Sequence, residues 1–61
     1  MAPLLLTVPE AADALAISRS KLYQLIASGA VDSIRIDGSR RVPVASLHDF
    51  IARMAAQEIP A

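Results

Sequence analysis

The sequence contains no cysteine and a single histidine, His48. Without cysteine the chain has no disulfide and no thiolate metal ligand, and a reducing cytoplasm is its expected setting. One histidine cannot supply the cluster of nitrogen and sulfur ligands that a zinc site requires. The sequence therefore predicts neither a metal site nor a fold held together by covalent cross-links.

Long apolar runs are also missing, although apolar residues make up 54% of the chain. Charged or polar residues interrupt every stretch well before the ~20 residues that a membrane-spanning helix needs. Residues 1–6 carry no positive side chain, so they do not resemble a secretory signal. Because 61 residues leave room for one compact core, we expect a single cytoplasmic domain over residues 1–61, with no membrane partner.

The groups that catalysis requires are lacking as well. No pairing of a nucleophile with a base, no pair of pocket carboxylates and no ligand cluster is recognisable. The two glycines, Gly29 and Gly38, each fit a turn rather than a phosphate-binding loop. We therefore expect no enzymatic activity, no cofactor and no small-molecule ligand.

What the sequence does have is an uneven distribution of charge. The chain is neutral, but residues 18–41 hold five cations against two anions, a net charge of +3, and the remainder holds one cation against four anions, a net charge of −3. Such segregation gives one side of a neutral protein a positive field that favours phosphate groups. The cations of the middle segment are Arg19, Lys21, Arg35, Arg40 and Arg41.

A first helix is predicted from about Val8 to Ala16. Thr7 and Glu10 have the spacing of a capping box, in which each side chain bonds the backbone N–H of the other residue. Pro9 fits the first turn of a helix, where its missing N–H has no partner to lose.

A second helix is predicted over Arg19–Ser28, with Ser18 as its N-cap and Gly29 as the left-handed residue that closes it. Its apolar residues share one side, which leaves a polar face to solvent. The short corner between the two helices, residues 16–18, is typical of a helix-turn-helix.

The period changes to two residues in Val31–Asp37, where Ile34 and Ile36 alternate with polar residues, so this segment is predicted to be a strand. Residues 37–39 are of types that favour a turn, and Arg40–Pro43 is predicted to be the return strand. The segment is therefore predicted to form a short hairpin. We expect Ile34 to pair with Val42.

That pairing would place Arg35 opposite Arg41 on the outer face of the hairpin. Like charges that face each other across strands are destabilising, so a negatively charged partner is expected there.

Helical spacing returns after Pro43 and predicts a third helix over Val44–Gln57. The expected fold class is therefore mainly α with a small β-hairpin, a winged helix-turn-helix in the order α-α-β-β-α.

The exposed face of the second helix and the hairpin form the candidate surface for double-stranded DNA. Gln24 can pair with adenine in a major groove, and Ser20 is compatible with several bases. Cations near a helix N-terminus can hold phosphates, whereas Tyr23 could instead cover the edge of the core. The candidate DNA-binding residues are Ser18, Arg19, Ser20, Lys21, Tyr23, Gln24, Arg35, Arg40 and Arg41.

From about Leu5 to Ile51 the sequence resembles the excisionase-type, MerR-like winged-helix family. The residues that carry this resemblance are Leu6–Ala12, Leu15–Ile26, Gly29, Ile34–Ile36, Arg41–Pro43 and Leu47–Ile51. The resemblance implies that the second helix occupies a major groove and that the basic hairpin follows the backbone into the neighbouring minor groove.

The resemblance also implies a biological role. Small winged helices of this type include phage excisionases, recombination directionality factors that bind repeated sites, bend DNA and direct an integrase toward excision. We therefore expect double-stranded DNA, an integrase and further copies of the chain on DNA as partners. A minimal transcription regulator and an adaptor that docks proteins through the Tyr23 face are the alternatives.

Overall fold

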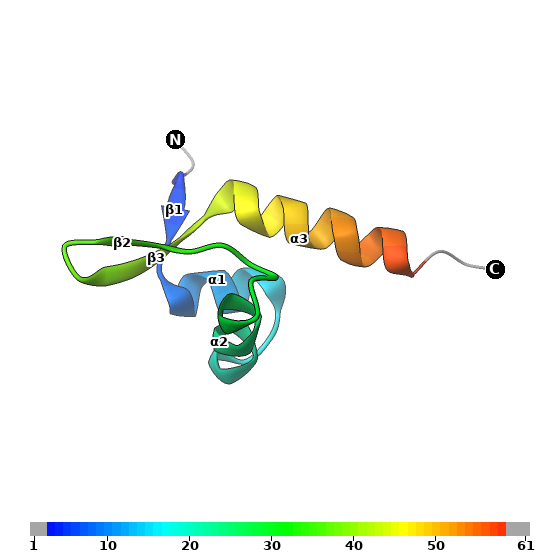
Figure 1. Ribbon diagram of the computed structural model, residues 1–61, viewed down its shortest axis with the longest axis horizontal. Coiled ribbons are helices and arrows are strands. Elements are labelled where there is room, and N and C mark those ends of the chain that lie inside the picture. The colour runs from blue at the N-terminus through cyan, green and yellow to red at the C-terminus, as the bar shows by residue number, and fades with distance from the viewer. Residues whose placement is uncertain (1–2, 59–61) are drawn as a thin grey trace.

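The computed structural model describes residues 3–58 and confirms the expected fold class (Figure 1). Three helices pack with a small sheet, and the hairpin extends away from the helices as a wing. The expectation of one domain over residues 1–61 reaches beyond the described residues and stays a prediction. The elements are β1 (Leu5–Leu6), α1 (Val8–Leu15), α2 (Arg19–Ala27), β2 (Ile34–Ile36), β3 (Ser39–Pro43) and α3 (Val44–Gln57).

The sheet has three strands rather than the two that the pattern predicts. β1 pairs antiparallel with β3, placing Leu5 opposite Pro43 and Leu6 opposite Val42. The strand order is β1-β3-β2, so β3 lies at the centre and the wing is anchored to the N-terminal segment. A strand of two residues is too short to show an alternating pattern, which is why the sequence does not predict it.

The core lies where the inner face of the sheet meets the helices. Two of the buried residues of α1 are alanines, and their small side chains let α1 and α2 approach each other closely. Leu22 of α2 is fully buried beneath them. The buried apolar residues are Val8, Ala11, Ala12, Leu22, Val31, Val42 and Leu47.

The start of α1 is fixed by the capping box that the sequence predicts. The Thr7 backbone N–H donates to Glu10 Oε1 at 2.8 Å, and the Glu10 backbone N–H donates to Thr7 Oγ1 at 3.2 Å. The bond from the Thr7 backbone is the main reason that the pKa of Glu10 lies below its ordinary value of 4.5. The Thr7 side chain and the charge of Arg41 lower this pKa further.

This capping box predicts a loss of stability in acid. Because the pKa of Glu10 is lowered in the folded state, the carboxylate stabilises the fold above pH 4.5, and that contribution disappears as the pH falls through the lowered value. Urea unfolding should be measured at about pH 7 and about pH 3. Between these two pH values the free energy of unfolding should fall less for Glu10→Gln than for the parent chain. Asp13→Asn is the control, because it removes an exposed acid from the same helix outside the capping box. Its free energy of unfolding should fall with pH as much as that of the parent chain. An equal decrease in the Glu10→Gln variant would contradict this role.

α3 begins directly after β3 and extends away from the other helices (Figure 1). Leu47 in its second turn is buried and Phe50 packs against the core, but residues 51–58 are exposed. The side chain of Arg53 reaches back to the end of α2, where Nη2 donates to the carbonyl oxygen of Ala30. No helix among the described residues is both long enough and apolar enough to span a membrane.

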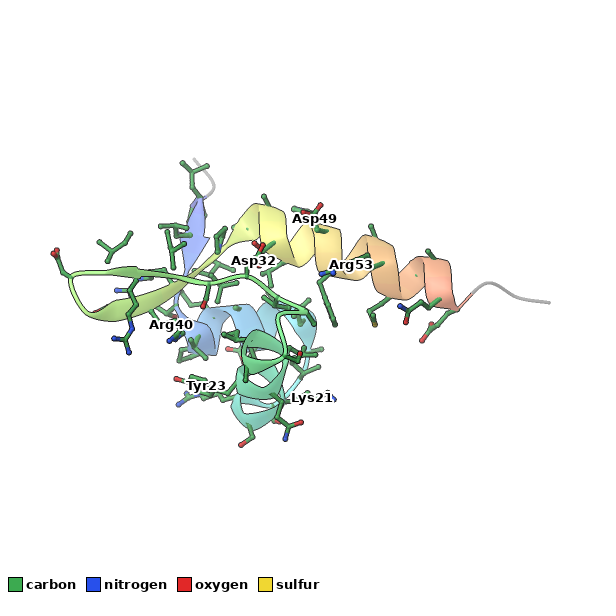
Figure 2. All side chains as sticks on the ribbon, viewed as in Figure 1. Lys21, Tyr23, Asp32, Arg40, Asp49 and Arg53 are labelled. Atoms are coloured by element: carbon green, nitrogen blue, oxygen red, sulfur yellow. The ribbon has the colours of Figure 1, made fainter. Side chains whose placement is uncertain are left out.

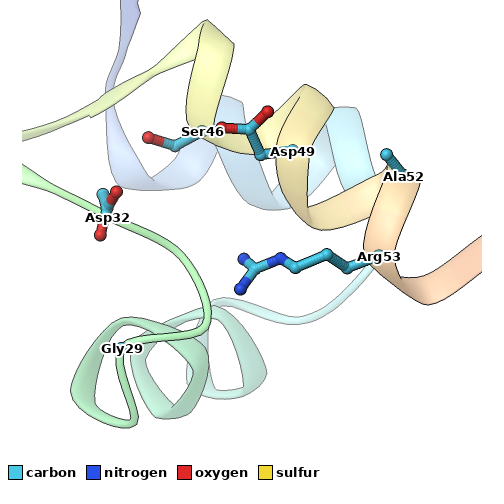
Figure 3. A pocket seen from close by; sticks show the side chains of 6 residues that line it. All are labelled: Gly29, Asp32, Ser46, Asp49, Ala52 and Arg53. Carbon is cyan, nitrogen blue, oxygen red and sulfur yellow. The ribbon is translucent and has the colours of Figure 1, made fainter.

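Arg53 lines a pocket between the end of α2 and α3 (Figure 3). Asp32 and Asp49 face this pocket together with Arg53, so it carries charges of both signs. Two of its residues, Asp49 and Arg53, lie on α3, away from Tyr23 and Arg40 in the view of Figure 2.

Candidate nucleic-acid interface

The corner between α1 and α2 sets the direction of the second helix. Ala16 adopts the left-handed conformation, with φ of 58°, and its N–H bonds the end of α1. The N–H of Ile17 then donates to the carbonyl oxygen of Ala12 at 3.0 Å, and the Ile17 side chain packs against the core. The chain leaves α1 through a closed turn, so α2 has a fixed orientation relative to α1.

The N-terminus of α2 is an uncompensated positive end. Ser18 Oγ caps it by accepting a hydrogen bond from the Lys21 backbone N–H at 3.1 Å. Its first turn contains Arg19 and Lys21 and no acidic residue, whereas the first turn of α1 contains Glu10. Cations beside the positive end of a helix dipole repel it, and an external phosphate would relieve that repulsion.

The exposed face of α2 has a centre and two flanks. Leu22 is buried and Leu25 and Ile26 pack against the core, as the sequence predicts. Opposite them, helical spacing puts Ser20 and Gln24 at the centre of the exposed face, and both are exposed.

Tyr23 and Lys21 lie on opposite flanks of α2 (Figure 2). Tyr23 is 53% exposed, so about half of the residue is accessible to a ligand. Arg19, four residues before Tyr23, shares its flank by helical spacing. Lys21 borders an apolar groove on the other flank, between α2 and α3. Cations on the two flanks suit a helix in a major groove, which has a phosphate backbone on either side.

The register of the wing differs from the one expected. Ile34 pairs with Arg41, Arg35 with Arg40 and Ile36 with Ser39, so the predicted pairing of Ile34 with Val42 is wrong. The reason is the length of the turn, which contains two residues rather than three. Asp37 and Gly38 both have positive φ, 52° and 79°, as in the two-residue turns that match the twist of a hairpin.

This change of register moves side chains between the faces of the wing. Arg35 and Arg40 share a face with buried Val42, which is the side of the sheet toward the helices. Arg41 lies on the outer face instead, so the expected pairing of Arg35 with Arg41 is also wrong. The argument about like charges now applies to Arg35 and Arg40, which face each other across the strands.

The structure therefore brings some predicted residues together and separates others. Arg40 projects from the wing on the same side of the molecule as Tyr23 (Figure 2). Arg41 is half-buried, and its Nη1 donates to the carbonyl oxygen of Arg40 at 3.0 Å. We call the surface made by the exposed face of α2 and the inner face of the wing the α2–wing surface. Its residues are Arg19, Ser20, Tyr23, Gln24, Arg35 and Arg40, with Lys21 at its far flank.

The chain is similar in sequence to known helix-turn-helix proteins. The family model described as a helix-turn-helix domain matches residues 5–55. An excisionase from Streptomyces ambofaciens is 47% identical over 57 residues, which are 93% of this chain and 92% of that protein. The chain belongs to the excisionase family of helix-turn-helix DNA-binding proteins.

A second excisionase-family relative is longer than this chain. A probable excisionase from Saccharopolyspora erythraea is 48% identical over 54 residues, which are 88% of this chain and 55% of that protein. The chain thus spans about half the length of that relative and nearly all of the Streptomyces protein. No solved structure matches the chain.

The sequence did not predict one residue that contacts the α2–wing surface. Ser33 lies in the loop between α2 and β2, is half-buried, and accepts a hydrogen bond from Arg40 Nη1 at 2.6 Å. The two residues are seven apart in the chain and follow no helical or strand spacing. Only the register of the hairpin shows that they meet, so no pattern in the sequence could have found Ser33.

Proposed function

We propose that this chain is an excisionase that binds repeated sites beside a recombination attachment site, bends the DNA and directs an integrase toward excision. It would act as an architectural protein, without a reaction of its own. The observation that carries the proposal is the α2–wing surface in a chain that covers 92% of an excisionase at 47% identity. A helix with a polar face and a basic wing on the same side suit adjacent grooves of a duplex.

Within this proposal, Gln24 reads bases and Arg35 positions the protein on the backbone. Gln24 lies at the centre of the exposed face, and Arg35 lies on the wing. Gln24→Ala should weaken binding to the target site by about 1–3 kcal/mol and relax the preference at one base step. Arg35→Gln should weaken all duplexes alike. Competition assays with single-base variants of the site would separate the two effects. If Gln24→Ala left the relative affinities for these variants unchanged, Gln24 would be a solvent-exposed residue that contacts no base.

A single copy should bind weakly, because one winged helix buries only about 600–1,000 Å² of protein surface on DNA. Useful occupancy then requires several copies on adjacent repeats, which contact each other or share a bend. The outer face of the wing supports this idea. Ile34 and Ile36 are 45% and 47% exposed there, on the side away from Arg35 and Arg40, so DNA contact does not account for them.

We therefore expect a monomer in free solution that loads cooperatively on tandem sites and curves the duplex. Ultracentrifugation of the free chain, with gel shifts on one, two and three repeats, measures both properties. An Ile34→Ser/Ile36→Ser variant should retain the affinity for one repeat and lose affinity for the second and third. A stable dimer off DNA, or independent binding without bending, would contradict this mode of action.

The biological role is tested by recombination in cells. The chain, its neighbouring integrase and a pair of attachment sites are placed on reporter plasmids, and excision and integration are measured with and without the chain. Excision should rise and integration should fall. DNA binding without any change in recombination would indicate a transcription regulator, and failure to shift any duplex would indicate a protein adaptor.

A further inference from the structure

Arg40 differs from the other cations of the α2–wing surface because a side chain of the protein holds it. Arg40 Nη1 donates to Ser33 Oγ at 2.6 Å, and both residues are half-buried. Arg19, Lys21 and Arg35 are exposed. A free arginine samples many rotamers, whereas one tied at a terminal nitrogen keeps its planar group in one place.

Ser33 holds Arg40 on the inner face of the wing, beside Arg35. Arg35 lies opposite Arg40 across the strands and repels it. Without the hydrogen bond to Ser33, this repulsion would favour rotamers of Arg40 that point away from Arg35. Ser33 accepts one of the five N–H donors of the guanidinium and leaves the others for a ligand. The side chain projects on the same side of the molecule as Tyr23, toward the space between the wing and α2 (Figure 2).

From these contacts we propose that Ser33 is a positioning residue, which aims Arg40 into a groove of the DNA and so determines discrimination between sequences. Its hydroxyl carries no charge and contributes nothing to counterion release, which governs binding to duplexes of any sequence. A guanidinium placed in advance can distinguish base edges or the width of a minor groove, whereas a mobile one finds the nearest phosphate. This role rests on the proposed DNA-binding surface.

The test compares Ser33→Ala, Ser33→Thr and Arg40→Ala with the parent chain. Each is titrated against a short duplex carrying the footprinted site and against a scrambled duplex of the same composition, at several salt concentrations. Ser33→Ala should bind the site about fivefold more weakly, the lower end of what one good base contact contributes. Its affinity for the scrambled duplex and its salt slope should equal those of the parent. Ser33→Thr, which restores the hydroxyl, should regain most of the lost discrimination.

Arg40→Ala is the reference for a lost cation. It should weaken both duplexes and make the salt slope shallower by about 0.9. Adding Ser33→Ala to Arg40→Ala should have no further effect on discrimination, because Ser33 acts through Arg40. Circular dichroism and thermal melting of each variant show whether the fold is retained.

Three outcomes would overturn the role of Ser33: parent discrimination in Ser33→Ala, an equal loss on both duplexes in a folded Ser33→Ala, or an additive effect in the double variant. These outcomes can be distinguished from the result expected if the α2–wing surface did not bind DNA. If the surface itself were wrong, Arg40→Ala would bind both duplexes as the parent does.

Discussion

Raising the salt concentration from about 50 mM to about 200 mM should weaken binding of this chain to duplex DNA by about 150-fold. Four cations carry this expectation: Arg19, Lys21, Arg35 and Arg40. If each neutralises about one phosphate charge, the slope of log affinity against log salt is about −3.6, because each neutralised charge contributes about −0.9. Arg41 stays a predicted contact but is left out of this count, because it lies on the outer face of the wing, away from the α2–wing surface.

Fluorescence anisotropy with a labelled duplex at a series of salt concentrations measures this slope. Arg35→Gln should make it shallower by about 0.9. Arg53→Gln is the matched control, because Arg53 lies on α3, outside the α2–wing surface and away from Tyr23 and Arg40 in the view of Figure 2. A parent slope near zero, or an equal change in both variants, would contradict an electrostatic role for the α2–wing surface.

Leu22→Ala should leave most molecules unfolded at room temperature or lower the melting temperature by more than about 10 °C. Leu22 has no exposed surface and lies at the centre of a core that contains only seven buried apolar residues in the described part of the chain, two of them alanines. Truncation of a buried leucine costs about 2–5 kcal/mol. A domain of this size has a free energy of unfolding of only about 3–9 kcal/mol.

Ile51→Ala is the control for this experiment. Ile51 is also aliphatic and helical, but it is 50% exposed on α3. Its truncation should lower the melting temperature by only a few degrees, on the order of 1 kcal/mol or less. Calorimetry or circular dichroism measures both, and similar melting temperatures for the two variants would show that α2 is not the centre of the core.

Local chemistry made the helices predictable from the sequence. The Thr7 and Glu10 capping box and the Ser18 cap mark the starts of α1 and α2 within single residues, and the structure shows the expected hydrogen bonds. The predicted bounds of α3 match the structure. Gly29 is left-handed, with φ of 83°, and follows the end of α2 as expected.

The wing was less predictable because its geometry depends on contacts between distant residues. Asp37 and Gly38 are compatible with a turn of two or of three residues, and that choice decides which face each arginine occupies. The expected strand Val31–Asp37 shortens to Ile34–Ile36, since Val31 turns into the core before the pairing begins. The alternating isoleucines suggest a buried face but lie on an exposed one, because the wing extends beyond the helices that would cover it (Figure 1).

The edge position of β2 has a consequence for the protein when no DNA is bound. An edge strand with two exposed isoleucines is a template for pairing with the same strand of another molecule, which leads to aggregation. β2 is only three residues long, and Arg35 stands between Ile34 and Ile36 with Asp37 directly after them. Short edges interrupted by charge resist such pairing, because stacked copies would bring like charges together. Arg35 therefore acts as a gatekeeper that disfavours strand pairing between unbound copies, in addition to its proposed contact with DNA.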